Sequence, residues 1–439
     1  MNNLLSFASV MKSIGGVLLA IVILLAMVTI HEFGHYLAGK ILGFKINEFS
    51  VGFGPALFKK RSKKTGELFA VRVIPLGGYC AFDGEDEDDE PQKPASAEQQ
   101  NDPSQTTEGV FEDMNPESAE SSEPKTKPLE TPVEEKKEEY PEPKGERFND
   151  QPPWKRIIVL IAGATMNYLL ALVLIVVMFA CLGRPVFKIT KFEPNKDFKT
   201  ETAIEVYENG LQTGDIILEI NGEKMYLSTD YLDLLDGKKK GDEVKILVLR
   251  NNKKTTIKLA LIEDVNVVNM SDSNSIFFPL GIAYREEIKL EDGTTELKMI
   301  NGGMIETDNV RAGFWETIGT SFAYSFKLSG VVLRSLGELF TGKLGVEAMG
   351  GPITTISSTA KVASDSLFSF LYIASFIGVN LAVFNLLPIP ALDGCKVIFC
   401  VIEWIRRKPV NRKVEAVIHF AGIILLFGFA ILVDLLHLF

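Results

Sequence analysis

The sequence predicts a polytopic α-helical membrane protein with four transmembrane helices and one α+β domain outside the membrane. Hydrophobic residues make up 46% of the 439 positions and charged residues 23%, so apolar and polar segments must alternate along the chain. The apolar residues collect in four blocks, each long enough to cross a bilayer as a helix. These blocks are residues 14–30, 157–182, 367–387 and 414–438.

The first block has an alternative interpretation as a secretory signal peptide. A signal peptide ends in a small-residue cleavage site. No such site follows here, because the apolar run passes directly into His31-Glu32-Phe33-Gly34-His35. A transmembrane helix is therefore the favoured interpretation.

Lysine and arginine cluster in the two short connections that follow the first and third blocks. Short loops rich in these residues stay in the cytoplasm, whereas long domains are translocated largely regardless of charge. The clusters are Lys59, Lys60, Arg61, Lys63 and Lys64, and Arg406, Arg407, Lys408, Arg412 and Lys413. This distribution predicts that both connections are cytoplasmic and that both termini and residues 183–364 lie outside.

The net charge of −11 originates in residues 83–150, which hold 23 acidic and 7 basic side chains. This stretch is rich in Pro, Ser, Gln and Glu and has few large apolar side chains, so it cannot bury enough surface to offset its ordering entropy. We predict a disordered acidic cytoplasmic insert. An acidic tether for a basic partner is the less favoured alternative.

The end of the first block carries a pattern typical of zinc hydrolases. His31 and His35 lie four residues apart on a predicted helix, so both project from one face and can share an ion. Two imidazoles supply neutral ligands to zinc, and the adjacent Glu32 can act as general base on water activated by the ion. Ionisable groups at membrane depth need a compensating partner, which a metal ion provides. His419 and His437, in the last block, are predicted to make polar contacts rather than to bind metal.

Catalytic zinc usually takes three protein ligands, so a third donor must come from elsewhere in the chain. The third block runs in the same direction as the first, so its cytoplasmic end lies at the depth of the histidines. That end reads Asn380-Leu-Ala-Val-Phe-Asn385-Leu-Leu-Pro-Ile-Pro-Ala-Leu-Asp393-Gly, and its prolines break the helix where irregular backbone must line a cavity. Asp393 has a loop cap as its alternative role, and Cys395 is an alternative ligand. We favour Asp393 because of its depth and because a carboxyl ionises far more readily than a thiol.

These residues resemble the site-2 protease family, in particular the bacterial regulator of sigma-E protease type. The resemblance rests on the histidine motif together with the motif that ends in Leu392-Asp393-Gly394, and it extends to four further stretches. They are Gly52-Phe-Gly-Pro55, residues 69–79, Gly163-Ala-Thr-Met-Asn167 and Met349-Gly-Gly-Pro-Ile353. The resemblance implies a zinc metalloendopeptidase of the bacterial inner membrane with its active site toward the cytoplasm. His31, His35 and Asp393 would bind Zn²⁺, and Glu32 would be the general base.

The resemblance also implies how substrate is held. Residues 47–82 would form a β element that dips into the membrane near the active site, and the alternation in residues 69–74 suits strands. Asn380 and Asn385 would position the substrate backbone or the tetrahedral intermediate. The expected partners are the lipid bilayer and single-span membrane proteins, such as anti-sigma factors or remnant signal peptides, with no nucleic acid. Cys395-Lys396 departs from the family, whose members often have a second glycine at this point.

Residues 184–310 are predicted to form the domain outside the membrane. Residues 210–222 combine a turn, an alternating strand and an Asn-Gly turn, and they resemble part of a PDZ domain, with further strands over residues 244–250 and 255–261. PDZ domains bind peptides by adding a strand to a sheet edge. The resemblance implies a gate that contacts substrate ectodomains and excludes bulky ones, and a plain spacer is the alternative. Residues 311–364 include an amphipathic stretch expected to lie on the membrane surface.

Other functions fit parts of the sequence. A membrane scaffold or receptor would use the PDZ-like domain alone and would not need Glu32 and Asp393. A transporter would also contain broken helices with intramembrane charges, but no inverted repeat is visible. Within the enzymes, the alternative is a membrane zinc protease of the prenyl-protein type, which usually draws its third ligand from a downstream glutamate.

The expected organisation of the chain follows from these observations. Residues 1–46 hold the first transmembrane helix, 47–82 the β element, 83–150 the acidic insert and 151–183 the second transmembrane helix. Residues 184–310 hold the PDZ-like domain, 311–364 the membrane-surface segment, 365–402 the third transmembrane helix with the aspartate motif and 403–439 the fourth.

Overall fold

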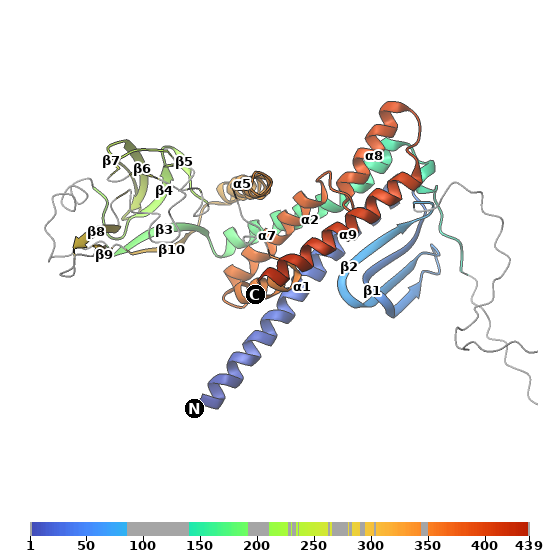
Figure 1. The fold of residues 1–439 in the computed structure, drawn as a ribbon, viewed down its shortest axis with the longest axis horizontal. Coiled ribbons are helices and arrows are strands. Elements are labelled where there is room, and N and C mark those ends of the chain that lie inside the picture. The colour runs from blue at the N-terminus through green and yellow to red at the C-terminus, as the bar shows by residue number, and fades with distance from the viewer. Residues whose placement is uncertain are drawn as a thin grey trace, which may run out of the picture.

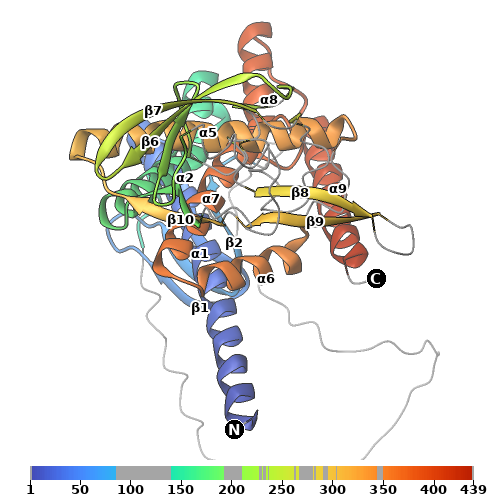
Figure 2. The same cartoon turned by 90° about the vertical axis from the view of Figure 1, so that its left-hand side faces the viewer.

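The computed structural model describes residues 2–85, 140–191, 210–226, 230, 234–235, 237–261, 264–265, 280, 283–289, 295–302, 304–343 and 350–437. The described elements form three groups (Figures 1 and 2). A bundle of long helices lies in the middle, a two-stranded β element lies at one end, and a β-rich domain lies at the other.

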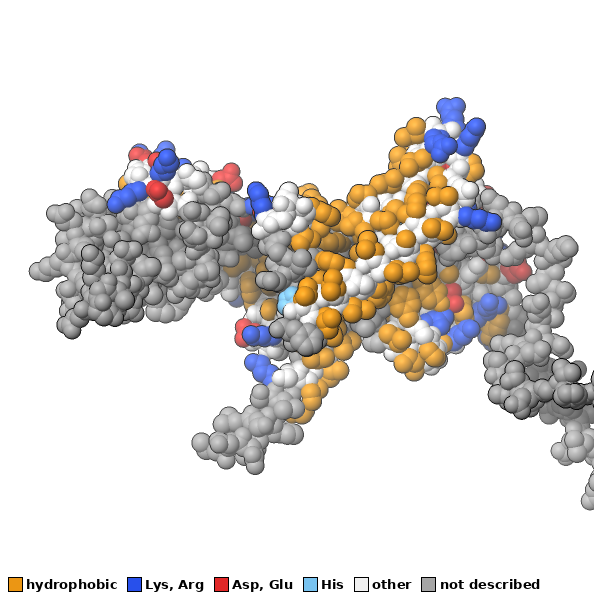
Figure 3. All heavy atoms as spheres, viewed as in Figure 1, with side chains coloured by type: hydrophobic (Ala, Val, Ile, Leu, Met, Phe, Trp, Pro, Cys, Tyr) orange, Lys and Arg blue, Asp and Glu red, His pale blue; other side chains and the backbone are white. Residues whose placement is uncertain are grey.

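The four apolar blocks form four long helices, as predicted. They are α1 (Asn2–Leu42), α2 (Pro153–Cys181), α7 (Leu367–Asn385) and α9 (Arg412–Leu436). Each is long and apolar enough to cross a membrane, over Met11–Leu42 in the case of α1. Figure 3 shows hydrophobic side chains over much of the visible surface of the bundle, which is the surface expected where lipid replaces water.

Glycines bring the central helices α1, α2 and α7 close together. Lipid gives apolar helices no hydrophobic reason to associate, so membrane bundles use small residues to increase van der Waals contact. A Cβ atom added at Gly378 of α7 would lie 3.0 Å from the Cβ of Ala171 and 3.2 Å from the sulfur of Met27. One added at Gly34 of α1 would lie 2.8 Å from the carbonyl carbon of Ala162. Larger residues at these positions would push the helices apart.

The segment predicted as one transmembrane helix over residues 365–402 is two helices. Helix α7 ends at Asn385, and α8 (Asp393–Arg406) begins at the aspartate of the motif. Pro388 and Pro390 lie in the connection, where they interrupt the helical hydrogen bonds as expected. Asp393 therefore occupies the first turn of a separate helix rather than the end of a span.

The β element beside α1 is a bent antiparallel hairpin of β1 (Ile46–Arg61) and β2 (Leu68–Phe82), in which residues 48–51 of β1 lie between residues 68–71 and 78–81 of β2 and pair with both. Apolar side chains at its far end are exposed, namely Phe53, Leu57, Phe58, Val71, Val73 and Ile74. A polar network ties the strands together, because Arg72 donates hydrogen bonds to Glu48 at 2.6 Å and to the hydroxyl of Tyr79 at 2.7 Å. The predicted strand pattern in residues 69–74 is thus confirmed.

Most of the predicted acidic insert, residues 86–139, lies outside the described residues. Its predicted end at residue 150 is too late, because residues 140–150 join the folded part of the chain. Glu146 forms a β-bridge with Phe44, and the 3-10 helix Phe148–Asp150 places the ring of Phe148 in a buried cluster with Phe44 and Phe82. Aromatic burial of this kind stabilises an ordered segment.

The β-rich domain contains an antiparallel sheet with the strand order β10-β3-β4-β6-β7, and β5 pairs with β4. The strands are β3 (Arg184–Lys191), β4 (Ile216–Ile220), β5 (Glu223–Lys224), β6 (Glu243–Arg250), β7 (Lys253–Ala260) and β10 (Met304–Val310), beside a hairpin of β8 (Ala283–Lys289) and β9 (Thr295–Gly302). The strands predicted at residues 244–250 and 255–261 are confirmed. Asn221 and Gly222 both have positive φ, at 53° and 86°, as the predicted Asn-Gly turn requires.

Two further helices connect this domain to the bundle. Helix α5 (Phe314–Phe340) buries Tyr324 and Leu328 and exposes the apolar side chains of Phe314, Trp315 and Phe326. The side chain of Lys327 on α5 forms an ion pair with the buried Asp230 at 3.0 Å.

Helix α6 (Pro352–Ala363) begins against α9. Asp434 of α9 accepts hydrogen bonds from the backbone nitrogens of Ile353 at 2.9 Å and Thr354 at 3.1 Å, so a carboxylate from another helix satisfies the free amides of the first turn. Gly351 leaves room for this carboxylate, because a Cβ atom there would overlap it.

Candidate metal centre

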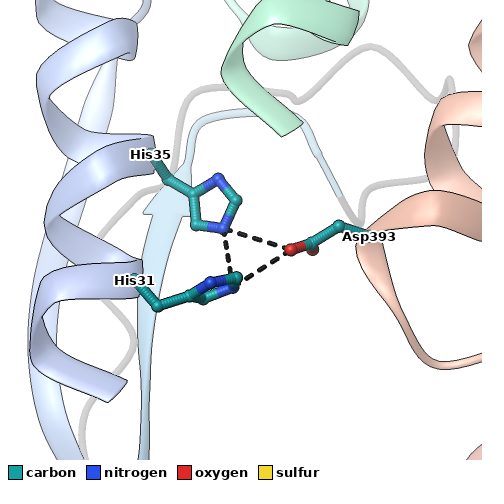
Figure 4. Close-up of side chains that lie close together, drawn as sticks. All are labelled: His31, His35 and Asp393. Atoms are coloured by element: carbon teal, nitrogen blue, oxygen red, sulfur yellow. Dashed lines mark hydrogen bonds and ion pairs between the residues drawn. The ribbon is translucent and has the colours of Figure 1, made fainter. Parts of the chain in front are cut away.

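Three predicted ligands from distant parts of the chain meet beside the bundle (Figure 4). His31 and His35 project from the same face of α1, and Asp393 approaches them from the start of α8. The Nε2 atoms of the two histidines are 3.1 Å apart, and Oδ2 of Asp393 lies 3.0 Å from Nε2 of His31 and 3.4 Å from Nε2 of His35. The predicted convergence of Asp393 with the histidine pair is present.

A backbone carbonyl of α2 fixes the orientation of one imidazole. Nδ1 of His35 donates a hydrogen bond to the carbonyl oxygen of Val159 at 2.8 Å. A neutral imidazole carries one proton, so Nε2 then presents a lone pair to the centre. Metal-binding histidines usually have such a second hydrogen bond, which holds the ring in the ligating orientation.

Gly163 of α2 lies directly against both imidazoles. A Cβ atom at this position would lie 2.6 Å from Cε1 of His35 and 2.8 Å from Cε1 of His31. Both distances are far below ordinary van der Waals contact. The site therefore requires glycine on α2 at the point where this helix passes the histidine pair.

The donor atoms fit a zinc ion. Zinc bonds to nitrogen and oxygen ligands at about 2.0–2.2 Å in a tetrahedron, which places the ligand atoms roughly 3.3–3.6 Å apart. The observed separations of 3.0, 3.4 and 3.1 Å are close to this spacing. Among the residues that the structure describes, the buried Oδ2 of Asp393 has no hydrogen bond, and these three residues are the group able to hold a metal ion. Lone pairs that face one another in this way require a cation.

Glu32 lies in the cavity that adjoins this group. The cavity has a volume of about 440 Å³ and is lined by Glu32, Tyr79 and Glu85 besides the three ligands. Strand β2 reaches the glutamate through Gly78, where a Cβ atom would lie 3.1 Å from Cγ of Glu32 and 2.9 Å from the carbonyl oxygen of Ser50. Gly78 therefore lets the β element pass beside the predicted general base.

The two predicted substrate-positioning asparagines occupy different environments. The side-chain amide of Asn385 lies 3.3 Å from Nδ1 of His31, at the edge of the metal group. Nδ2 of Asn380 donates to the carbonyl oxygen of Phe376, in the preceding turn of α7, at 2.9 Å. The structure thus brings Asn385 to the site and leaves Asn380 on its own helix.

Ion pairs hold α8, and with it Asp393, against the rest of the site. Glu403 of α8 pairs with Arg156 of α2, whose side chain is 1% exposed. Lys396, one turn after Asp393, pairs with Glu85 at 2.7 Å. A buried pair of this kind is strongly destabilising to break, because it leaves an uncompensated charge.

The sequence did not identify three of these contributions. The carbonyl of Val159 has no sequence signature, because every residue carries the same group. Gly163 belonged to a motif that the resemblance included without a role. Arg156 was not distinguished from other basic residues at the ends of the spans, although a single arginine at the start of an apolar helix often has a partner inside the bundle.

Cys395, the alternative ligand, does not belong to the described metal group. Its side chain is buried, and the described residues whose donor atoms cluster are His31, His35 and Asp393. Zinc binds the thiolate form of cysteine, and a thiol ionises far less readily than a carboxyl group. Aspartate is therefore the better third ligand.

The first prediction separates these two candidates. Asp393→Ala should lose zinc and proteolysis together, because it removes one of three ligands, while Cys395→Ser should keep both. The zinc content of the purified variants measures this directly. Zinc retained by Asp393→Ala and lost from Cys395→Ser would contradict the assignment.

The second prediction concerns the close approach of α2. Gly163→Ala should weaken zinc binding about tenfold or more, because the added methyl group displaces both imidazoles. Gly330→Ala, on α5, is the control, because a Cβ atom there meets nothing within 4 Å. Zinc affinity measured by competition with a chelator distinguishes the two. Equal affinities would show that the helices can separate without disturbing the site.

Comparison with known proteins agrees with this geometry. The family model described as Peptidase family M50 matches residues 19–429. The chain is 27% identical to the zinc metalloprotease RasP of Bacillus licheniformis, over 90% of this chain and 92% of that protein. It is also 27% identical to the regulator of sigma-W protease RasP of Bacillus subtilis, over 92% and 93%. A putative zinc metalloprotease of Fusobacterium nucleatum is 25% identical over 95% and 96%. The chain belongs to peptidase family M50, the site-2 proteases, and it is a zinc metalloprotease and a multi-pass bacterial membrane protein.

Proposed function

We propose that this protease hydrolyses peptide bonds in or next to the transmembrane segments of single-span membrane proteins. The observation that carries the proposal is the place of the metal group, near the end of a helix long and apolar enough to cross a membrane. A substrate bond must reach that depth to be cut. Segments that span the bilayer as a single helix meet this requirement.

His31, His35 and Asp393 would hold the zinc ion, which would supply the Lewis-acid chemistry that lets water lose a proton near neutral pH. Glu32 accepts that proton as the water attacks the carbonyl carbon of the substrate. It then donates the proton to the leaving amide nitrogen, so one carboxylate serves both steps. The backbone carbonyl of Val159 keeps His35 in one orientation throughout these steps.

Asn385 is the better placed of the two asparagines to hold the substrate. Its amide lies beside His31, where it can donate to a substrate carbonyl or to the negative charge that develops on the oxygen. Asn380 lies more than one turn earlier on the same helix, and its oxygen remains available for an extended backbone.

The β element is suited to receive an extended substrate. Peptide bonds inside a helix are shielded by their own hydrogen bonds, so a substrate must unwind before cleavage. A strand of the β1–β2 hairpin offers backbone partners to the unwound segment, as in β-strand addition. The exposed apolar side chains of this hairpin support its dipping into the membrane beside the site.

The PDZ-like domain would control access rather than take part in the reaction. Figure 1 shows it at the end of the bundle opposite the β element, and the metal group adjoins β2. A gate at that end would reject substrates with bulky ectodomains and admit those already trimmed. Anti-sigma factors and remnant signal peptides are substrates of this kind, and the name of the Bacillus subtilis relative refers to regulation of a sigma factor.

The charge distribution supports an orientation with the active site toward the cytoplasm. The basic residues that follow α1 and α8 along the chain are those that the charge rule places in the cytoplasm, and His31 and His35 lie in the half of α1 that precedes the first of these clusters. The PDZ-like domain would then be extracytoplasmic, on the side where ectodomains are trimmed.

The third prediction tests the proposed reaction. Glu32→Gln should retain zinc and lose proteolysis by about 10²-fold or more, because a neutral amide cannot accept the proton. Cleavage of a single-span test protein in reconstituted vesicles, together with the zinc content, measures both properties. Glu316→Gln, an exposed residue of α5, is the control. Unchanged cleavage by Glu32→Gln would refute the mechanism.

The fourth prediction tests the orientation. Single cysteines at Lys63 and Arg407 should react with a membrane-impermeant thiol reagent only after the cells are opened, and one at Asn251 should react in intact cells. A Cys181→Ser background removes the exposed native thiol. If the sites at Lys63 and Asn251 reacted from the same side, the four-span arrangement would be wrong.

A further inference from the structure

The connection between α7 and α8 determines where Asp393 lies, and it contains an unusual backbone conformation. Ala391, two residues before the aspartate, has a φ of +80°. This region is unfavourable for a residue with a Cβ atom and is normally occupied by glycine. Such a conformation persists only where its surroundings enforce it.

The contact that holds Ala391 comes from α9. The backbone nitrogen of Ala391 donates a hydrogen bond to Nδ1 of His419 at 3.1 Å. A donor nitrogen requires an unprotonated acceptor, so His419 is the neutral tautomer with its proton on Nε2. The imidazole also contacts Phe399 of α8, with ring centroids 5.9 Å apart.

Helix α9 is shaped to receive this connection. Gly422 lies one turn after His419 on the same face of the helix. A Cβ atom at Gly422 would lie 2.7 Å from both the carbonyl carbon and the carbonyl oxygen of Pro390. Because Gly422 has no side chain, Pro390 and Ala391 pack directly against α9. His419 then accepts the hydrogen bond from the backbone N–H of Ala391.

We propose that His419 is a positioning residue of the zinc site, acting through Ala391 on Asp393. It fixes the strained turn, and the turn fixes the carboxylate at the distance that the two histidines of α1 require. This inference rests on the proposed ligand role of Asp393. It gives a specific role to the polar contact that the sequence predicts for His419.

His437, the other histidine of α9, makes a polar contact within its own helix instead of with the connection before Asp393. Its Nδ1 atom bonds to the carbonyl oxygen of Val433 in its own helix at 2.9 Å. It therefore provides a matched control for substitution of a histidine on the same helix.

The test is the rate at which the purified full-length protein loses zinc to an excess of chelator. His419→Leu should release zinc about tenfold faster than the wild type or more, as expected when a residue that orients a ligand is lost. His419→Asn should stay close to the wild-type rate, because its side-chain oxygen can take the place of Nδ1. His437→Leu should release zinc at the wild-type rate.

A second variant separates the effect on the turn from a general loss of stability. Adding Ala391→Gly to His419→Leu should slow zinc release again, because glycine adopts positive φ without an anchor. Should His419→Leu fail to fold, His419→Asn and His419→Gln carry the test, since only asparagine places its oxygen near the Nδ1 position.

Two results would overturn the proposal. One is wild-type zinc release from His419→Leu, and the other is equal release from the asparagine variant and the variants without an acceptor near Nδ1. Zinc retention by Asp393→Ala would instead refute the ligand assignment itself, so the two ideas fail in different ways.

Discussion

The close crossing of α1 and α2 is the constraint on which the site depends. Gly34 brings the backbone of α1 against Ala162, and Gly163 brings α2 against the two imidazoles. The same approach places the carbonyl of Val159 within reach of His35. One helix-helix contact therefore sets the distance between the helices, the orientation of a ligand and the space for the ion. Small residues at a membrane crossing usually serve packing alone, whereas here they also set the positions of the predicted ligands.

The chemistry of the site explains why this geometry must be held so firmly. An ionisable group at the centre of a membrane helix costs roughly 2.5–3.5 kcal/mol on insertion scales. Several such groups together would rival the whole stability of a typical domain. A shared cation removes most of this cost, because it is surrounded by the donor atoms that would otherwise face one another. Metal binding and folding of this end of the bundle are therefore coupled.

Much of this arrangement was predictable from the sequence, because it follows from local patterns. Apolar runs predicted the four long helices, and alternation of apolar and polar residues predicted strands of the β-rich domain. The equal membrane depth expected of Asp393 and His31 predicted that they lie close together. The remainder depends on contacts between distant residues. A backbone carbonyl such as that of Val159 is invisible in a sequence, and so is the positive φ of Ala391. Residues 140–150 adopt a defined structure because Phe148 packs against aromatic side chains of other segments. Composition alone does not reveal such a contact.

Helix α9 is exposed over much of its length, yet it contacts the rest of the molecule through specific polar groups near both ends. Asp434 caps α6 at one end, and His419 holds Ala391 nearer the other. In lipid, where apolar surface gives little drive for association, such hydrogen bonds and close glycine contacts decide where a helix docks. On the proposed role of His419, the predicted third zinc ligand depends on the docking of a peripheral helix. If lipid or a substrate segment displaced α9, the displacement would be transmitted to Asp393 through the backbone of Ala391 and Leu392.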